Sequence, residues 1–486
     1  MKANTLVIRK RNKKSYIFIY LLIFLFRTKQ NNQIKTMNRF TSRIKQLTIC
    51  VALILLCISC SRKDSDPKLT NKDIAKVLEE MTQLMIQDVS NPPLAARFYT
   101  YACISGYTVL ALNDSTVIPL KGFFNEFPEI TTPLDSGHYS YQLSAILAMT
   151  GTAKKMQPSG KQFNAFEQKL LDSCRKLGFS DETIGNSQSY ANQIVKQIMP
   201  YAKKDRYNRI SNYPRYTPLN TEGSWYPTPP AFFSPVEPYF NTVRPFLIDS
   251  AEAFKSVPPI PYSKDKNSPF FKLLMANYID GGAGLTAENR EIAAFWDCNP
   301  FALKNEGHLL IGLKKISPGA HWIGITGIAC QKAKVDFSKT LQIYTIVAAG
   351  LTDSFISCWD EKYRSNRIRP ETAIRNLIDP NWKPMLQTPP FPEYMSGHSH
   401  ISSTTATILT YFFGDNFSYT DNVEDKYGLK ARKFSSFNSA AEEAAMSRYW
   451  GGIHFKDGIE NGVKVGVKIG AHIVNTLKAK NVMPLK

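Results

Sequence analysis

The sequence predicts an all-α protein whose core is two packed helix bundles, with a long proline- and aromatic-rich loop lying on them. Apolar residues recur at helical spacing along most of the chain after position 70. The strict two-residue alternation that marks a half-buried strand is scarce. No segment repeats with a period of about 20–50 residues, so a solenoid of stacked repeats is not expected.

Residues 1–59 are expected to be a leader of the lipoprotein type. They contain twelve Lys and Arg and no Asp or Glu, and an apolar run from Leu47 to Ile58 ends just before Cys60. A cationic start, an apolar run and a small residue before a cysteine resemble a bacterial lipoprotein signal, with Cys60 as the acylated residue. A transmembrane anchor would need ~20 apolar residues. An earlier apolar run favours a start at Met37 over an unusually long leader.

The chain's net charge of +20 is concentrated in this leader, because the remainder holds 48 basic and 40 acidic side chains. A mild excess of this kind does not indicate a nucleic-acid partner. We therefore expect a protein of the bacterial cell envelope, periplasmic or surface-exposed, that touches the membrane only through a lipid on Cys60.

Five cysteines follow Cys60, and none belongs to a C-x-x-C pair, so zinc and thioredoxin chemistry are not expected. Their number is odd, so they cannot all pair with one another. The sequence predicts buried, unreactive thiols at Cys103, Cys174, Cys298, Cys330 and Cys358.

Residues 60–70 are polar and are expected to form a tether. The N-terminal helical part, 71–290, opens with apolar residues at helical spacing: Ile74, Val77, Leu78, Met81, Leu84 and Met85. The prolines of "NPPLAARF" predict the start of a second helix, because proline is tolerated in a helix's first turn. Helical patterns continue through residues 140–205.

Residues 213–246 are too rich in proline and aromatic side chains for a helix, yet too apolar for a disordered linker. They predict a long loop packed on the helical body. Helical patterns resume near residue 250 and run through the C-terminal helical part, 291–486, which carries the candidate site. Turns are predicted at "SPGAHW" and "GDNFSYTDN".

A helix is predicted from Asp336, as its N-cap, to Arg369. Its apolar residues follow alternating spacings of four and three, and the same stripe continues through Lys362 and Arg369. Burial of unpaired cations is costly, so an anion is expected to meet them. Alternatively, the helix emerges from the core and these two side chains are solvated.

A second block, Ser396-Gly397-His398, precedes an apolar helix. Free backbone N–H groups at a helix start bind anions, and glycine allows an anion close to the backbone. The serine hydroxyl adds a hydrogen bond, and the imidazole adds a proton carrier. By itself this block is also an ordinary helix start.

The third block begins with a predicted helix of small residues that ends near Arg448. His454 follows this helix, and Asp457 lies three residues after His454. A carboxylate near a histidine can fix its tautomer and raise its nucleophilicity. The alternative for His454 alone is a hydrogen-bonded core histidine.

In this order the blocks read K-x6-R-P, S-G-H and S-R-x5-H. They resemble the signature of the superfamily that joins vanadium-dependent haloperoxidases to type 2 phosphatidic-acid phosphatases. "WYPTPPAFFSPVEPYF", "SPGAHWIGIT" and "TPPFPEYMSGHS" resemble the soluble haloperoxidase branch, so the likeness covers roughly 75–475. Two positions depart from the family pattern. Asp457 follows the last histidine by three residues where four is usual, and Met395 replaces the proline before S-G-H.

The resemblance implies a cage for tetrahedral vanadate or phosphate, formed by Lys362, Arg369, Ser396, Gly397, Arg448 and His454. His454 would bind the vanadium, His398 would transfer protons and Lys362 would polarise the peroxide. Asp457 would act on His454, and Asp297 would pair with Arg448. Trp359 and Phe391 match aromatic positions on the halide side. His400 has no role in the family and is expected to be a packing or surface residue.

The leading function is a vanadate-dependent haloperoxidase that oxidises halide with hydrogen peroxide to a hypohalous species. The alternative is a soluble acid-phosphatase-like phosphoesterase, without a cofactor, that forms a phosphohistidine at His454 from phosphate esters. A third possibility is a surface lipoprotein that only binds phosphate. The presence of both His398 and His454 argues against simple binding.

The C-terminal helix carries glycines at four-residue intervals. Each costs ~1 kcal/mol relative to alanine in a helix interior. They predict close approach of a neighbouring helix to Gly458, Gly462, Gly466 and Gly470.

Overall fold

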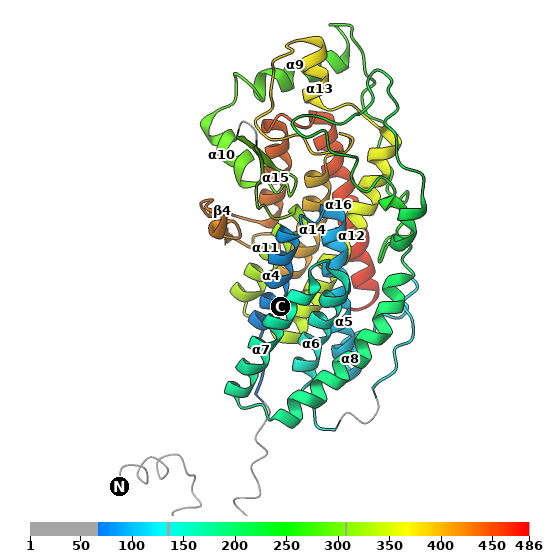
Figure 1. Cartoon of the computed structure of the whole chain (residues 1–486), viewed down its shortest axis with the longest axis vertical. Coiled ribbons are helices and arrows are strands. Elements are labelled where there is room, and N and C mark those ends of the chain that lie inside the picture. The colour runs from blue at the N-terminus through cyan, green and yellow to red at the C-terminus, as the bar shows by residue number, and fades with distance from the viewer. Residues whose placement is uncertain (1–66, 134–136, 307–308, 486) are drawn as a thin grey trace, which may run out of the picture. The chain divides into compact units, whose positions relative to one another are not determined.

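Helices make up most of the structure, as predicted (Figure 1). This computed structural model describes residues 67–133, 137–306 and 309–485. The predicted leader, its possible start at Met37 and the lipid site at Cys60 lie outside the described residues, as does most of the predicted tether.

The N-terminal helices form the first bundle: α4 (Asn71–Gln87), α5 (Pro92–Asn113), α6 (Tyr141–Met156), α7 (Phe163–Leu177) and α8 (Asp181–Lys203). The predicted apolar stripe of α4, which includes Ile74 and Met81, is buried. Asn91 caps α5, and the predicted Pro92 lies in its first turn. Short 3-10 turns follow at η1 (Gly160–Gln162), η2 (Tyr207–Asn212) and η3 (Phe240–Thr242).

The second bundle contains α11 (Pro318–Lys332), α12 (Phe337–Ser365), α14 (Gly397–Phe413), α15 (Phe437–Trp450) and α16 (Lys456–Ala479). The long helix α12 packs against both α5 and α14, so it belongs to both bundles. Its length and composition would allow it to cross a membrane, but its apolar window is 94% buried inside the protein. Core helices of globular proteins share this composition.

Three short helices lie outside the bundles: α9 (Pro269–Asp280), α10 (Ala287–Phe295) and α13 (Pro370–Leu377). Two small antiparallel hairpins pair β1 (Leu303–Glu306) with β2 (Leu309–Gly312) and β3 (Tyr419–Asp421) with β4 (Arg432–Phe434), with η4 (Asp425–Tyr427) between the last two strands. The hairpins were not predicted, because three- and four-residue strands are too short to show an alternating pattern.

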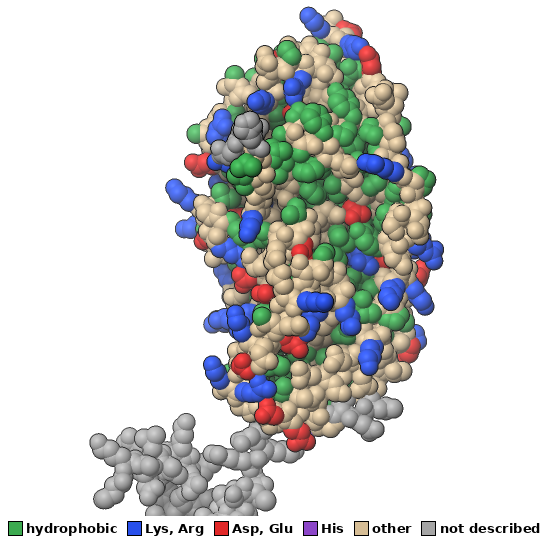
Figure 2. Space-filling model, viewed as in Figure 1, with side chains coloured by type: hydrophobic (Ala, Val, Ile, Leu, Met, Phe, Trp, Pro, Cys, Tyr) green, Lys and Arg blue, Asp and Glu red, His purple; other side chains and the backbone are tan. Residues whose placement is uncertain are grey.

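The loop 213–246 is irregular apart from η3, and it packs on the end of α12, as predicted. The carbonyl of Val236 accepts hydrogen bonds from the Trp359 indole at 3.1 Å and the Tyr363 hydroxyl at 2.7 Å. The Trp225 amide donates to the carbonyl of Asn366. On the face shown in Figure 2, basic and acidic side chains are interspersed, and hydrophobic side chains gather in the upper half.

Three predicted boundaries were wrong. The helix capped by Asp336 ends at Ser365 and not at Arg369, because Asn366 adopts a left-handed conformation with φ of 51°. Helices resume at α9, about twenty residues later than predicted. The "SPGAHW" segment is a helix start and not a turn, because Ser317 caps α11.

The predicted glycine face of α16 packs against α14. A Cβ atom on Gly466 would lie 2.3 Å from the His400 carbonyl oxygen, and one on Gly462 would lie 3.0 Å from the Ser396 carbonyl oxygen. These glycines allow α16 to lie close to the first turns of α14, where Ser396, Gly397 and His398 are located.

Candidate active site

The second and third sequence blocks line one cavity, and the cations of the first block contact residues of its wall. Its wall combines polar groups with prolines and aromatic rings: Pro92, Cys298, Asn299, Pro300, Phe301, Pro318, Phe355, Trp359, Pro389, Phe391, Gly397, His398, Arg448, Ile453 and His454. The chain segments that meet here lie far apart in sequence, so the tertiary fold creates the site.

Lys362 is fully buried in the last turn of α12. Its ammonium donates to the backbone carbonyls of Pro392, Glu393 and Met395 at 2.9, 3.0 and 2.5 Å. Burial lowers the pKa of Lys362 to about 7. The solvated alternative for this side chain is therefore excluded. The three carbonyls hold its charge against the segment that leads into α14.

Arg369 is also fully buried, but it caps α13 and does not extend α12. It donates to the carbonyls of Phe391 and Ile453 at 2.8 and 2.9 Å, and its Nη1 lies 3.1 Å from His454 Nε2. Its Nη2 has no hydrogen-bond partner. Burial, together with nearby cations such as Arg448, lowers the pKa of Arg369 to about 9.

Arg448 reaches the cavity from the last turn of α15. It donates to the Trp296 carbonyl at 2.8 Å and lies 3.6 Å from Asp297, which confirms the predicted ion pair. Asp297 also pairs with Lys315. The Nε of Arg448 has no hydrogen-bond partner, and burial lowers the pKa of this side chain.

Ser396 is the N-cap of α14, and its hydroxyl accepts a hydrogen bond from the Ser399 amide at 3.3 Å. A helix start leaves backbone N–H groups without intrahelical partners. A Cβ atom on Gly397 would meet only Trp359, at 3.8 Å, so protein packing does not require a glycine here. Close approach of an anion to the backbone would explain it.

His398 lines the cavity, and its Nε2 lies 3.1 Å from the Trp296 carbonyl oxygen. Because a carbonyl only accepts hydrogen bonds, Nε2 carries the proton and Nδ1 is free of one. Burial and the nearby Arg448 lower the pKa of His398 well below its usual value. The imidazole is therefore neutral, and its Nδ1 carries no proton.

His454 is held by Glu393 and not by the predicted Asp457. Its Nδ1 lies 2.8 Å from the Glu393 carboxylate, which also accepts from the Phe455 amide. Asp457 instead pairs with both terminal nitrogens of Arg367 at 2.6 and 2.8 Å. A proton on Nδ1 leaves a lone pair on Nε2, and this lone pair accepts the hydrogen bond from Arg369 Nη1. Burial, followed by the nearby Arg369, lowers the pKa of His454 well below its usual value.

Glu393 is the functional residue that the sequence analysis missed. It lies 61 positions before His454, so no local spacing connects the two. The signal was present as a single acidic residue in the otherwise apolar stretch "PPFPEYM". Glu393 also pairs with Arg367, and this arrangement links the segment before α14 to the start of α16.

The predicted halide-side residues form an aromatic wall. Trp359 and Phe391 both line the cavity, with ring centroids 5.0 Å apart. Their faces lie 5.8 and 5.0 Å from the Lys362 ammonium. His400 is fully buried in α14 with neither ring nitrogen hydrogen-bonded, and it does not line this cavity, so it is a packing residue.

The residues present fit a small tetrahedral oxyanion such as vanadate. Lys362, Arg369 and Arg448 are all buried here, and burial lowers the pKa of each. Two guanidinium nitrogens, Arg369 Nη2 and Arg448 Nε, have no hydrogen-bond partner. The nearby carboxylates do not reach these two nitrogens, because Glu393 pairs with Arg367 and Asp297 pairs with Lys315 and with Nη2 of Arg448. An anion is the missing partner of this donor set.

Comparison with known proteins agrees with this reading. Residues 342–481 match the family model described as the VCPO second helical-bundle domain. No curated protein matches the chain at a significant level. Two crystal structures of a bacterial vanadium-dependent chloroperoxidase, holo and apo, are 16% and 14% identical to it, with TM-scores of 0.60 and 0.58. They cover 81% and 80% of this chain, and 94% and 96% of their own chains, and they show the fold alone.

The structure of a bacterial vanadium-dependent iodoperoxidase is 40% identical, with a TM-score of 0.80, and the match covers 84% of this chain and 97% of that one. Identity of this extent over nearly the whole relative, together with the oxyanion cage and the helix bundles, shows that the chain belongs to the vanadium-dependent haloperoxidases.

Proposed function

We propose that this protein catalyses the vanadate-dependent oxidation of halide by hydrogen peroxide to a hypohalous species, with iodide as its halide. One observation carries the proposal: Arg448 and His454 line one aromatic-walled cavity, and two further buried cations stand against its wall. Arg369 contacts Nε2 of His454, and the ammonium of Lys362 lies 5.0 Å from the ring centroid of Phe391. The choice of iodide rests on the similarity to the iodoperoxidase.

The residues that would hold vanadate are Lys362, Arg369, Ser396, Gly397, Arg448 and His454. Bound vanadate would supply a Lewis acid that activates peroxide for attack by halide. The Nε2 lone pair of His454 is the ligand atom, and Glu393 orients the ring by accepting the Nδ1 proton. A hydrogen-bonded carboxylate also raises the basicity of a metal-bound histidine.

His398 would move the proton. It lines the cavity as a neutral imidazole with a free Nδ1, so it can take a proton from hydrogen peroxide as the peroxide enters the site. The proton on Nε2 stays with the Trp296 carbonyl and keeps the ring in this tautomer. General acid–base catalysis of this kind contributes about 10²–10⁴-fold in rate.

Trp359 and Phe391 would form the approach path of the halide. An apolar wall over a cationic cage suits a large, weakly hydrated anion, because removing its hydration shell costs little. The ammonium of Lys362 behind both rings adds attraction without exposing its charge to solvent.

The test is iodide oxidation by the metal-free protein with hydrogen peroxide, with and without added vanadate. We expect turnover only with vanadate, and none in His454→Ala at any vanadate concentration. Bromide and chloride measured in parallel give the halide preference. Phosphate-ester hydrolysis that vanadate inhibits, without halide oxidation, would contradict the proposal and identify the phosphoesterase.

We also propose that a lipid on Cys60 anchors the protein in the bacterial cell envelope. The cationic start, apolar run and cysteine of residues 37–60 support this. The test of the lipid anchor is detergent phase partitioning of membranes from cells that express the wild-type protein or Cys60→Ala. The wild-type protein should enter the detergent phase, and the Cys60→Ala variant should not.

A further inference from the structure

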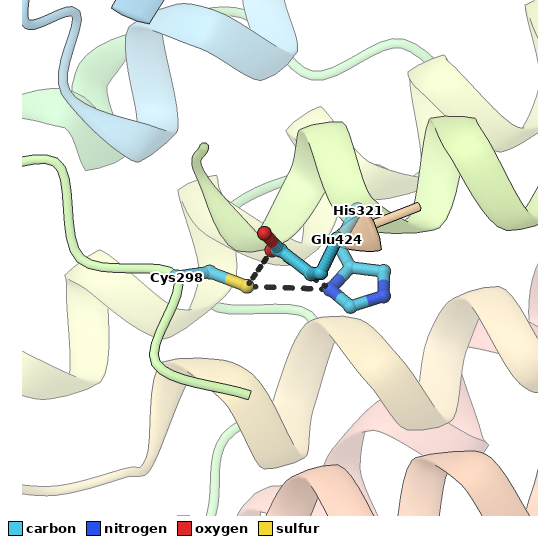
Figure 3. Close-up of side chains that lie close together, drawn as sticks. All are labelled: Cys298, His321 and Glu424. Carbon is cyan, nitrogen blue, oxygen red and sulfur yellow. Dashed lines mark hydrogen bonds and ion pairs between the residues drawn. The ribbon is translucent and has the colours of Figure 1, made fainter. Parts of the chain in front are cut away.

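A second cluster of metal-ligating side chains lies beside the active-site cavity. Cys298 follows α10, His321 lies in the first turn of α11, and Glu424 follows β3 (Figure 3). All three are buried, and Cys298 also lines the cavity. The function proposed above assigns no role to these three side chains.

The three ligand atoms have the mutual distances of a tetrahedral metal site. Cys298 Sγ lies 3.3 Å from His321 Nδ1 and 3.6 Å from Glu424 Oε1, and Nδ1 lies 3.6 Å from Oε1. Metal–sulfur bonds of about 2.3 Å and metal–nitrogen or metal–oxygen bonds of about 2.0–2.1 Å give tetrahedral edges of about 3.3–3.6 Å. A nitrogen–oxygen distance of 3.6 Å is too long for a hydrogen bond.

The groups around His321 are those usually found around a metal-bound histidine. The second ring nitrogen of His321, Nε2, lies 2.8 Å from the fully buried Asp421 carboxylate. A carboxylate on the far nitrogen fixes the tautomer and turns Nδ1 toward the metal. The Trp296 ring stacks on the imidazole, with centroids 4.6 Å apart, and holds its plane.

We propose that Cys298, His321 and Glu424 bind a divalent cation of the Zn²⁺ type, with water as the fourth ligand. Binding releases two protons to solvent, the thiol proton of Cys298 and the Nδ1 proton of the His321 imidazolium that pairs with Asp421, and it forms a metal–thiolate and a metal–imidazole bond. The thiolate and the Glu424 carboxylate then balance the charge of the cation, so the buried cluster carries no net charge. A thiolate, an imidazole and a carboxylate are the ligands that Zn²⁺ takes in proteins.

Such a metal would position part of the active site. The segment 296–298 is the immediate neighbour of the cage residue Arg448 and of the proton carrier His398, because the Trp296 carbonyl accepts from both. Asp297 lies 3.6 Å from Arg448. A metal on Cys298 ties this segment to α11 and to the turn after β3, so the carbonyl stays in place.

The experiment titrates Co²⁺ into the metal-free full-length protein. We expect one Co²⁺ per chain, with a sulfur-to-cobalt charge-transfer band and the intense visible bands of a tetrahedral site. Cys298→Ala should lose the band and the bound metal. Cys330→Ala is the matched control, because Cys330 is also a buried thiol and lies on α11 with His321. It should keep both.

Two further variants separate this site from the vanadate site and from folding defects. His454→Ala should lose vanadate binding and keep one Co²⁺ per chain. Asp421→Asn, which leaves all three ligands in place, should bind Zn²⁺ roughly 10–100-fold more weakly. Wild-type protein that takes up no Co²⁺, a Cys298→Ala protein with an unchanged spectrum, or an unchanged Zn²⁺ affinity in Asp421→Asn would each overturn the proposal.

Discussion

Single side chains define the chemistry of the cage, and the carboxylate behind His454 is the clearest case. Asp457 was expected to hold this histidine because it lies three residues away in sequence. The first turn of α16 instead directs Asp457 to Arg367. The carboxylate that contacts His454 is Glu393, whose oxygen lies 2.8 Å from Nδ1 of the ring. The two carboxylates share Arg367, so one buried cation satisfies both.

Glu393→Gln should therefore weaken vanadate binding by ~10–100-fold, because the ring of His454 loses its charged acceptor. Asp457→Asn should leave vanadate affinity within a few-fold of wild type, since the contact between His454 and Glu393 remains. Equilibrium dialysis of vanadate against both variants measures this. Equal losses in the two variants would mean that Asp457 also acts on the site.

Lys362 gives a pH prediction for the protein without vanadate. Its pKa is about 7 in the folded chain and near the ordinary lysine value of 10.5 in the unfolded chain. Between these values the unfolded chain binds more protons at this residue, so the contribution of Lys362 to folding stability rises with pH across this window. Urea unfolding from pH 7 to about 9.5 should show a wild-type stability that climbs relative to Lys362→Met. Parallel curves would contradict the lowered pKa.

Among the elements, the pairing of α14 with α16 places the oxyanion site. The glycines of α16 bring its backbone against the first turns of α14. The Ser396 amide donates to the Gly458 carbonyl at 3.0 Å, so the two helix starts are joined at the cage. Any side chain on this face would push the S-G-H turn away from Arg448 and His454.

Gly466→Ala should destabilise the protein by ~1–3 kcal/mol, because the new methyl group would overlap the His400 carbonyl oxygen on α14. Gly185→Ala is the matched control. Gly185 lies exposed inside α8, and nothing lies within 4 Å of the added atom. This variant should gain up to ~1 kcal/mol from helix propensity. Thermal melts compare the two, and similar shifts would show that the α14–α16 contact tolerates a side chain.

At the scale of the whole molecule, the cage joins segments that only the folded chain brings together. The cage residues come from four helices: Lys362 lies in the last turn of α12, Arg369 is the N-cap of α13, Ser396 is the N-cap of α14 and Arg448 lies in the last turn of α15. The unfolded chain has no such site. Binding of an oxyanion therefore adds its full free energy to the stability of the fold.

Vanadate at about 100 times its Kd should stabilise the wild-type protein by ~2.7 kcal/mol and raise its Tm. His454→Ala should show little shift, since the lost ring is the ligand of the vanadium. Differential scanning calorimetry with increasing vanadate measures both. An equal shift in the variant would show that vanadate binds elsewhere or without this histidine.

The sequence by itself determined the helical class, the candidate cations and helix starts, and the glycine face of α16, while the resemblance to the haloperoxidase signature joined the three blocks into one oxyanion cage. These are properties of short spacings: a helix repeats every 3.6 residues, so buried stripes, caps and close-packed faces can be read from neighbouring positions. The cations at Lys362 and Arg369 were recognisable because they continued an apolar stripe, even though the helix ends at Ser365 and does not reach Arg369.

Only the tertiary structure decided which groups hold these residues in place. Glu393 and the cluster of Cys298, His321 and Glu424 come from segments dozens of residues apart, and no spacing rule connects them. Burial and the directions of the helix ends select these partners. A buried histidine or cation pairs with whichever polar group the fold brings within hydrogen-bonding distance, whatever its position in the chain.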